Sequence, residues 1–360
     1  MVSCESGNNN YNDELVENQE KKSSANKTLS SKKQFLFAIV TEEGCGFINN
    51  KGEEVIPPRF EYVDDFSEGM ALVLVENRLG FIDETGQFAI SPQYIDIGQK
   101  FRFFDHIGGM DIKTQNTRPI ENFSEGLIAV RIGEKWGYIN KTGQTAINPQ
   151  YDIAYGFSEG LALVKINEKY GFIDKEGKTV IDQVYEDAQP FSEGLAGINI
   201  GNKWGFINRK GQIVINPQFA NISRFSEGLA SVKIGDKWGY IDKEGHYAIN
   251  PLYDLAWDFS EGLAGVYIND SWGYIDKTGH IVINPQFSMA SDFASGLARV
   301  GIGDDIFHLK WGFIDKNGRY VINPQYDFAM DFKNGLAMVR TDYDYMGYID
   351  KTGKSIWELK

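Results

Sequence analysis

Short apolar stretches alternate with polar, glycine-containing turns along most of this chain. In residues 157–190 the apolar stretches are LALVKI (161–166), KYGFID (169–174) and KTVI (178–181). The NE pair between the first two is typical of a two-residue hairpin turn, and Gly177 allows the next reversal. The pattern predicts a three-stranded antiparallel meander, with a fourth short strand in the stretch that leads to the next FSEG motif.

Both faces of these predicted strands are expected to be covered. LALVKI and its copies LASVKI and LAGVYI carry apolar residues at odd and at even positions. A sheet with one solvated face would instead alternate apolar with polar residues. Small sheets stacked face to face on the preceding and following copies would bury both sides, as the blades of a propeller do.

The whole unit recurs with a period of 34 residues. A glycine at the same place in each unit marks nine copies, namely Gly46, Gly80, Gly137, Gly171, Gly205, Gly239, Gly273, Gly312 and Gly347. Most copies are 34 residues apart, and the longest interval, 57 residues, separates Gly80 from Gly137. The motif FSEG, or a weaker form of it, precedes every unit except the first, and NPQY or NPQF closes most units. Such a period indicates a repeat architecture in which each unit buries its apolar faces against its neighbours.

The chain resembles the WG-repeat family, also called KWG repeats, of mainly bacterial proteins. The resemblance covers roughly residues 35–357 and rests on the recurring KWGYID phrase. The signature tryptophan is present as Trp136, Trp204, Trp238, Trp272 and Trp311. Cys45, Leu79, Tyr170 and Met346 take its place in the other copies, which favours an apolar packing role for this position.

These patterns predict an all-β fold of nine tandem β-meander repeats of ~34 residues in a propeller-like array. The alternative is an open β-solenoid or superhelix, because nine units exceed the usual four to eight blades. The first unit lacks a leader motif and the last is complete, an offset that would let the two ends meet. We expect residues 1–34 to form a disordered polar tether and residues 35–360 the repeat domain, with an insertion at about 98–118.

Composition and charge exclude several classes of function. The net charge of −14 argues against binding of duplex nucleic acid, which needs a basic surface. Two cysteines and four scattered histidines predict neither a disulfide framework nor a thiolate metal cage. No apolar run reaches the ~18 residues of a transmembrane helix.

The repeated acids are interpreted as turn residues. They are Glu68, Glu125, Glu159, Glu193, Glu227 and Glu261 of FSEG and Asp83, Asp174, Asp242, Asp276, Asp315 and Asp350 of the later turn. A ring of cation-binding carboxylates is the alternative, but Asn140 and Asn208 replace two of the turn aspartates and would bind cations less well. We predict no metal site and no cofactor.

Nothing in the sequence predicts catalysis. The acids recur with the fold, and the usual nucleophile, phosphate-loop and zinc motifs are absent. His246 and His280 occupy the same place in consecutive repeats, so they either approach each other across neighbouring blades or lie exposed beside their turns.

The insertion is the most informative departure from the repeat. Its basic and aromatic residues include Lys100, Arg102, Phe103, Phe104, His106 and Arg118. Aromatic and arginine side chains are enriched in interface hot spots, and loops on rigid scaffolds often carry binding. The alternative is a degenerate repeat or a hairpin that packs its phenylalanines on the array.

Cys4 precedes the polar N-terminal segment. The sequence VSC followed by a polar linker resembles the end of a bacterial lipoprotein signal, although only three residues precede Cys4. Cys4 is therefore either a lipid anchor or part of an ordinary tail. The first interpretation places the protein at the cell envelope or outside the cell, and the second in the cytoplasm.

Together these features predict a non-catalytic interaction scaffold that binds a protein or glycan partner through loops of a rigid β-repeat body. A hydrolase built on a propeller and a purely structural spacer are the alternatives, because fold alone does not dictate function.

Overall fold

A computed structural model describes residues 34–94, 122–305, 307–341 and 345–359 of the chain. Contacts divide the chain between Phe35 and Leu36, and residues 36–360 form one compact unit. The described part of this unit consists of 34 β-strands in nine antiparallel sheets and contains no helix. We call these sheets blades 1 to 9 in chain order. The all-β prediction is confirmed.

Most blades have four strands, as the repeat predicts. The first strands are short, except for the longer β11, and comprise β4 (Tyr62–Val63), β11 (Ile153–Ser158), β15 (Asp187–Ala188), β19 (Asn221–Ile222), β23 (Leu255–Ala256), β27 (Met289–Ala290) and β31 (Phe328–Ala329). The second strands are β1 (Leu36–Thr41), β5 (Met70–Val75), β8 (Leu127–Ile132), β12 (Leu161–Ile166), β16 (Leu195–Ile200), β20 (Ala230–Ile234), β24 (Leu263–Ile268), β28 (Ala298–Ile302) and β32 (Leu336–Thr341). Blades 1 and 3 have three strands each among the described residues.

The third and fourth strands complete each blade. The third strands, which carry the WG motif, are β2 (Gly44–Asn49), β6 (Arg78–Asp83), β9 (Lys135–Asn140), β13 (Lys169–Ile173), β17 (Lys203–Asn208), β21 (Lys237–Ile241), β25 (Ser271–Asp276), β29 (Lys310–Ile314) and β33 (Tyr345–Asp350). The fourth strands are β3 (Glu54–Phe60), β7 (Phe88–Tyr94), β10 (Thr145–Tyr151), β14 (Thr179–Tyr185), β18 (Ile213–Phe219), β22 (Tyr247–Tyr253), β26 (Ile281–Phe287), β30 (Tyr320–Tyr326) and β34 (Ser355–Glu358).

The turns follow the chemistry that the sequence predicts. Asn167 and Glu168 have φ values of 49° and 63°, the left-handed pair that a type I′ hairpin turn requires. In the next turn the Asp174 carboxylate accepts hydrogen bonds from the N–H groups of Glu176 and Lys178, and Gly177 has a φ of 80°. The turn aspartates therefore satisfy backbone groups of their own turns.

The hydrophobic core lies between the blades. In β12 the residues from Leu161 to Val164 are all buried, so both faces of the sheet are covered, as predicted. Nine clusters of buried apolar residues occur in the described part of the chain. Eight are each shared by two successive blades, and the ninth joins blades 1 and 9. A leader phenylalanine packs edge-on against the third strand of the preceding blade, as Phe259 does on Tyr240 with ring centroids 4.9 Å apart.

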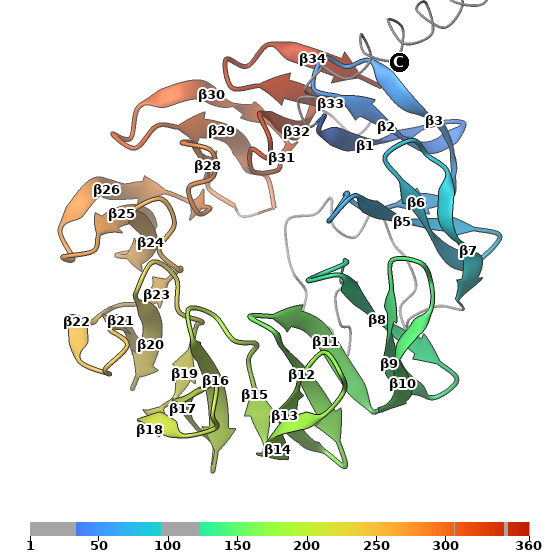
Figure 1. Ribbon diagram of the computed structural model, residues 1–360. Helices are drawn as coiled ribbons and strands as arrows, with labels where there is room; N and C mark the ends of the chain where they lie inside the picture. The colour runs from blue at the N-terminus through green and yellow to red at the C-terminus, as the bar shows by residue number, and fades with distance from the viewer. Residues whose placement is uncertain (1–33, 95–121, 306, 342–344, 360) are drawn as a thin grey trace, which may run out of the picture. The chain divides into compact units, whose positions relative to one another are not determined.

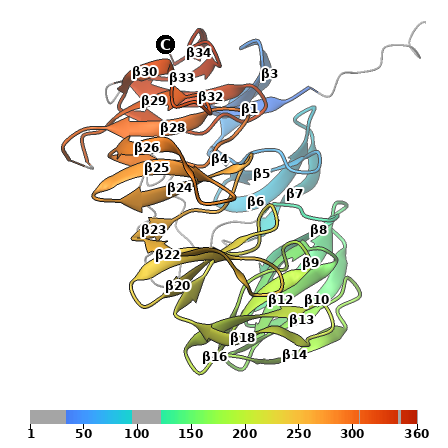
Figure 2. The ribbon, with the colours of Figure 1, turned by 90° about the vertical axis from the view of Figure 1, so that its left-hand side faces the viewer.

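One of these clusters closes the ring. Phe37 and Ile39 of blade 1 pack against Leu336 and Tyr348 of blade 9. The Tyr348 hydroxyl donates a hydrogen bond to the Ala38 carbonyl at 2.7 Å. β1 lies beside β32 in both views (Figures 1 and 2). The described residues between 36 and 359 therefore form a nine-bladed β-propeller, and the open-solenoid alternative is wrong.

The glycine of the WG motif is explained by a close backbone approach. The fourth strand bulges across the third at this point, and a Cβ on Gly239 would lie 2.6 Å from the Ile249 carbonyl oxygen and from the Pro251 nitrogen. No side chain fits there without moving the main chain, so the glycine is required on steric grounds.

Candidate functional site

The residues predicted for the insertion and the lipid anchor lie outside the described part of the chain. These are Lys100, Arg102, Phe103, Phe104, His106, Arg118 and Cys4. Among the histidines, His246 and His280 are highly exposed, and each lies against its own turn. The Nδ1 atom of His246 is 3.3 Å from the Asp242 carboxylate, and that of His280 is 2.7 Å from the Thr278 hydroxyl.

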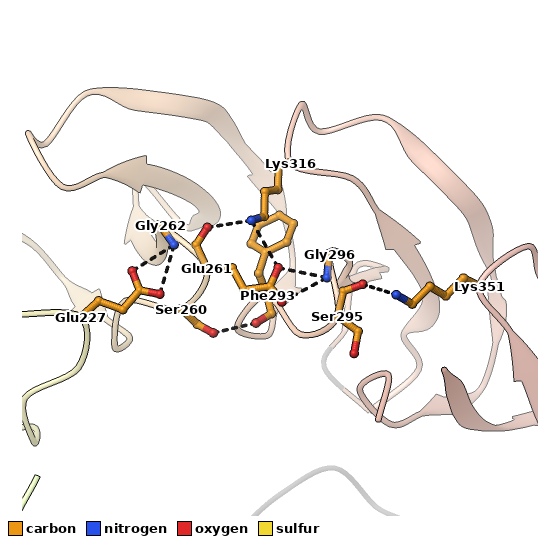
Figure 3. Close-up of polar contacts among 9 residues, drawn as sticks. All are labelled: Glu227, Ser260, Glu261, Gly262, Phe293, Ser295, Gly296, Lys316 and Lys351. Atoms are coloured by element: carbon orange, nitrogen blue, oxygen red, sulfur yellow. Dashed lines mark hydrogen bonds and ion pairs between the residues drawn. The ribbon is translucent and has the colours of Figure 1, made fainter. Parts of the chain in front are cut away.

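The FSEG motif links each blade to the next. The serine hydroxyl donates to the carbonyl oxygen of the following leader phenylalanine, as Ser260 does to Phe293 at 2.7 Å. The glutamate carboxylate accepts a hydrogen bond from the glycine N–H of the following leader. Figure 3 shows two such links, from Glu227 to Gly262 and from Glu261 to Gly296, each with a shortest distance of 3.0 Å.

A lysine from the following blade completes most of these links. Lys316 lies 3.3 Å from the Glu261 carboxylate and donates to the Glu261 carbonyl oxygen at 2.8 Å (Figure 3). The corresponding lysines are Lys141 for Glu68, Lys175 for Glu125, Lys243 for Glu193 and Lys277 for Glu227. We call the serine, glutamate and lysine contacts together the leader clasp.

The leader clasp corrects the interpretation of the repeated glutamates. They were expected to satisfy their own turns, but their carboxylates bind the next blade. Burial by itself raises the pKa of Glu193, yet hydrogen bonds from Lys243 and the Gly228 N–H outweigh it and hold this pKa below its ordinary value. Glu193 is therefore an ionised structural group.

The signature tryptophans also lie at blade interfaces. Trp136, Trp204, Trp238 and Trp311 are half-buried, and each packs against the apolar cluster shared with the following blade. Trp272 is buried in such a cluster. The Arg299 guanidinium lies 4.6 Å from the ring centre of Trp311, a cation–π contact within the propeller.

The repeated polar groups of the leader clasp and the signature tryptophans contact neighbouring blades within the propeller. Side chains that could meet a partner must therefore be sought at positions that differ between repeats. The two residues just before the leader phenylalanine differ between repeats. They include Asp64 and Asp65 in blade 2, Tyr155 and Gly156 in blade 4, Gln189 and Pro190 in blade 5, Ser223 and Arg224 in blade 6, Trp257 and Asp258 in blade 7, Ser291 and Asp292 in blade 8, and Met330 and Asp331 in blade 9.

Trp257 forms a fixed, exposed aromatic platform. Its ring stacks on that of Trp272 at an interplanar angle of 2° and a centroid distance of 5.0 Å. Its Nε1–H donates to the Ala290 carbonyl oxygen of blade 8 at 3.2 Å. Gly265 lies beneath the ring, because a Cβ there would be 2.7 Å from Trp257 Cδ1. The side chain is therefore held in place, while 42% of the residue stays exposed.

Three aspartates directly precede the leader phenylalanines of blades 7, 8 and 9. Asp258 is 3.8 Å from Arg224, and Asp331 accepts a hydrogen bond from the Ser291 hydroxyl and lies 3.4 Å from Arg299. The Asp292 carboxylate between them has no hydrogen bond or ion pair with any described residue. Asp292 is exposed to solvent. The surrounding blades nevertheless desolvate its carboxylate, and the charges of Asp258 and Asp331 add to this effect. Together they raise the pKa of Asp292 to about 6.

We call the set formed by Leu255, Trp257, Asp258, Asp292, Met330 and Asp331 the inner-strand patch. Leu255 and Met330 are 46% and 43% exposed. Figure 1 shows β23 and β31, which carry or precede these residues, on the inner side of the ring. The patch joins an aromatic platform, apolar side chains and carboxylates on three adjacent blades.

The described residues include no group of three or more His, Cys, Asp or Glu side chains placed to hold a metal ion. In the same part of the chain, no helix is long and apolar enough to cross a bilayer.

Comparison with known proteins identifies the repeat. The sequence model described as "WG containing repeat" matches residues 46–78, 80–99, 120–136, 136–170, 170–204, 204–238, 238–271, 272–304 and 311–345. A search of curated proteins gave no match.

Solved structures of similar architecture are distant in sequence. The designed protein Ika8 is 10% identical, with 82% of this chain and 95% of that chain covered and a TM-score of 0.47. BamB from Moraxella catarrhalis is 9% identical, with coverages of 78% and 93% and a TM-score of 0.44. The dihydro-heme d1 dehydrogenase NirN is 10% identical, with coverages of 91% and 72% and a TM-score of 0.43. At these sequence identities and TM-scores, the similarities support no conclusion about partner or activity.

Proposed function

The chain belongs to the family of the WG containing repeat, whose model matches most of it, and from this premise we propose that it is a non-catalytic interaction scaffold. The observation that supports this proposal is the division of roles within the repeat. Repeated polar and aromatic groups bind neighbouring blades, whereas the inner-strand patch leaves Trp257 and Asp292 exposed on a rigid frame. Preorganised aromatic side chains are typical anchors of binding surfaces.

A protein or a glycan is the partner class that the sequence predicts, and the patch favours a protein. Its exposed groups are aromatic, apolar and acidic, and they lie on strands that are fixed by the propeller. The insertion at about 98–118 remains a second predicted contact region. Attachment to the cell envelope through a lipidated Cys4 likewise remains a prediction, with a cytoplasmic location as its alternative.

Selective loss of a partner from a patch variant tests this proposal. Serine replaces Trp257 because Ser223 and Ser291 hold the same place in blades 6 and 8. The control is Val184→Ser, since Val184 is 59% exposed on the fourth strand of blade 4. Each chain is immobilised and exposed to envelope and cytosolic extracts of the source cell. We expect the intact chain and Val184→Ser to retain a partner that Trp257→Ser loses.

Equal retention by all three chains would overturn the assignment to the patch. If nothing is retained by any of them, a structural spacer is favoured over the scaffold. A chain without residues 98–118 tests the insertion separately, because loss of the partner from that chain alone would place recognition there.

A further inference from the structure

We propose that the inner-strand patch recognises a cationic segment of a protein partner, with an arginine or lysine side chain over Trp257 and beside Asp292. This inference rests on the proposed scaffold function and names the chemistry of its partner. It follows from the aromatic platform, from the charges of the three aspartates and from the exposed apolar residues of the patch.

The aromatic platform favours a cation. Tryptophan has the strongest attraction for a cation over its ring face among the aromatic residues. One face of Trp257 is occupied by Trp272, and the Nε1–H is already bound to Ala290, so the exposed ring surface is what remains for a ligand. Because the ring is held by these contacts, binding costs little side-chain entropy.

The charge around the platform favours a cation as well. Asp258, Asp292 and Asp331 lie on consecutive blades. Asp258 and Asp331 each have an ion-pair partner, namely Arg224 and Arg299. Asp292 has no ion pair with a described residue, and the more distant charge of Arg224 only partly offsets the rise in its pKa. Arg299 is committed to the propeller, because its guanidinium also covers Trp311 and donates to the Ala329 carbonyl oxygen. Asp292 therefore lies between two like charges with no cation bound to it among the described residues. A guanidinium or ammonium group there would relieve this repulsion.

Other ligand classes fit the patch less well. Nucleic acids and anionic lipid surfaces carry negative charge, which three carboxylates and a net charge of −14 would repel. A neutral glycan could stack on Trp257, but it carries no positive charge to offset that of the Asp292 carboxylate. Leu255 and Met330, both exposed, suit the methylene stems of long basic side chains.

Binding of short peptides to the full chain tests the inference. Hexa-arginine, hexalysine and hexaglutamate amides are titrated by calorimetry at about 0.15 M salt, where long-range attraction between exposed charges is largely screened. We expect the two basic peptides to bind and hexaglutamate not to bind. Trp257→Ser should weaken hexa-arginine binding several-fold, because it removes a cation–π contact at a partly exposed ring. Trp257→Phe keeps an aromatic face and should restore part of the affinity.

Matched charge variants separate recognition from general attraction. Asp292→Asn should weaken hexa-arginine binding several-fold, whereas Asp182→Asn, an exposed residue of β14, should leave it unchanged. Equal losses for both variants, or unchanged binding to Trp257→Ser, would overturn the inference. Circular dichroism of each variant establishes that the propeller is intact.

Failure of this inference is distinguishable from failure of the scaffold proposal. If a partner from extracts is lost by Trp257→Ser but hexa-arginine does not compete for it, the scaffold proposal stands and the cationic partner is wrong. Competition by a neutral oligosaccharide mixture instead of hexa-arginine would assign the patch to a glycan. If no partner is retained and no basic peptide binds, both proposals fail.

Discussion

Replacement of Gly239 by alanine is expected to lower the free energy of unfolding by about 3 kcal/mol or more. The added Cβ would lie 2.6 Å from the Ile249 oxygen and the Pro251 nitrogen and 2.7 Å from the Asn250 carbonyl carbon. All three are main-chain atoms, so no side-chain rotation can relieve the clash. The fourth strand of blade 6 would have to move away from the third, next to the fully buried Tyr240.

A second glycine of the same blade provides the control. Gly235 lies in the hairpin turn with a φ of 56°, and a Cβ added to it would meet no atom of another segment within 4 Å. Asn167 and Asn269 hold the same place in blades 4 and 7, each with a φ of 49°. Gly235→Asn should therefore change the unfolding free energy by less than about 0.5 kcal/mol. Urea unfolding, followed by circular dichroism, measures the unfolding free energies of Gly239→Ala and Gly235→Asn. Equal midpoints for Gly239→Ala and the wild type would contradict the steric argument.

Loss of one leader clasp should destabilise the propeller by about 1 to 3 kcal/mol near neutral pH. In Glu193→Gln the side chain keeps its length but loses the charge that binds Lys243 and the Gly228 N–H. In Glu193→Asn the shorter side chain also fails to extend as far as Lys243 and the Gly228 N–H. Asparagine suits the backbone there, because Asn334 holds the same place in blade 9 with a φ of 53°, equal to that of Glu193.

The effect of Glu193→Gln should depend on pH in a defined direction. Because the pKa of Glu193 is lowered in the folded chain, its stabilisation is present above the ordinary glutamate value of 4.5 and is lost as the pH falls through the folded value. The difference in unfolding free energy between the wild type and Glu193→Gln should therefore be largest at neutral pH and vanish well below pH 4.5. Glu176→Gln, an exposed turn residue, is the control. A difference that is unchanged in acid would show that the charge of Glu193 is not involved.

Local features of the fold follow from the sequence because they depend on residues close together in the chain. The hairpin at Asn167 and the turn at Gly177 use residue types that tolerate left-handed φ values, so both turns could be predicted. The apolar residues at odd and even positions of β12 likewise predicted sheets covered on both faces. Closure of the ring rests on Tyr348 and Ala38, which lie 310 residues apart, and no local pattern encodes that contact.

The role of the FSEG glutamates could not be inferred from one repeat. Glu193 meets Gly228 only because two blades stack at a particular distance, and the turn itself looks complete without this contact. A signal was nevertheless present. The lysine that follows the turn aspartate or asparagine recurs together with the glutamate of the preceding leader, as Lys243 does with Glu193.

The inner-strand patch consists of single replaced positions, which stand out less in the sequence than an added segment does. Alignment of the second residue before each leader phenylalanine gives Trp257 where blades 6 and 8 have Ser223 and Ser291. The glycine at 265, which makes room for this ring, is a second sign in the same blade. Neither sign reveals that the ring is exposed, since that depends on how blade 7 meets blade 8.

Site-specific photo-crosslinking tests most directly the claim that the inner-strand patch is the binding surface. The photoreactive residue p-benzoylphenylalanine replaces Leu255 in one chain and Val184 in another, both exposed in the propeller. After irradiation in cell extract, we expect a crosslinked partner from position 255 and none from position 184. A partner crosslinked equally from both positions, or from position 184 alone, would contradict it.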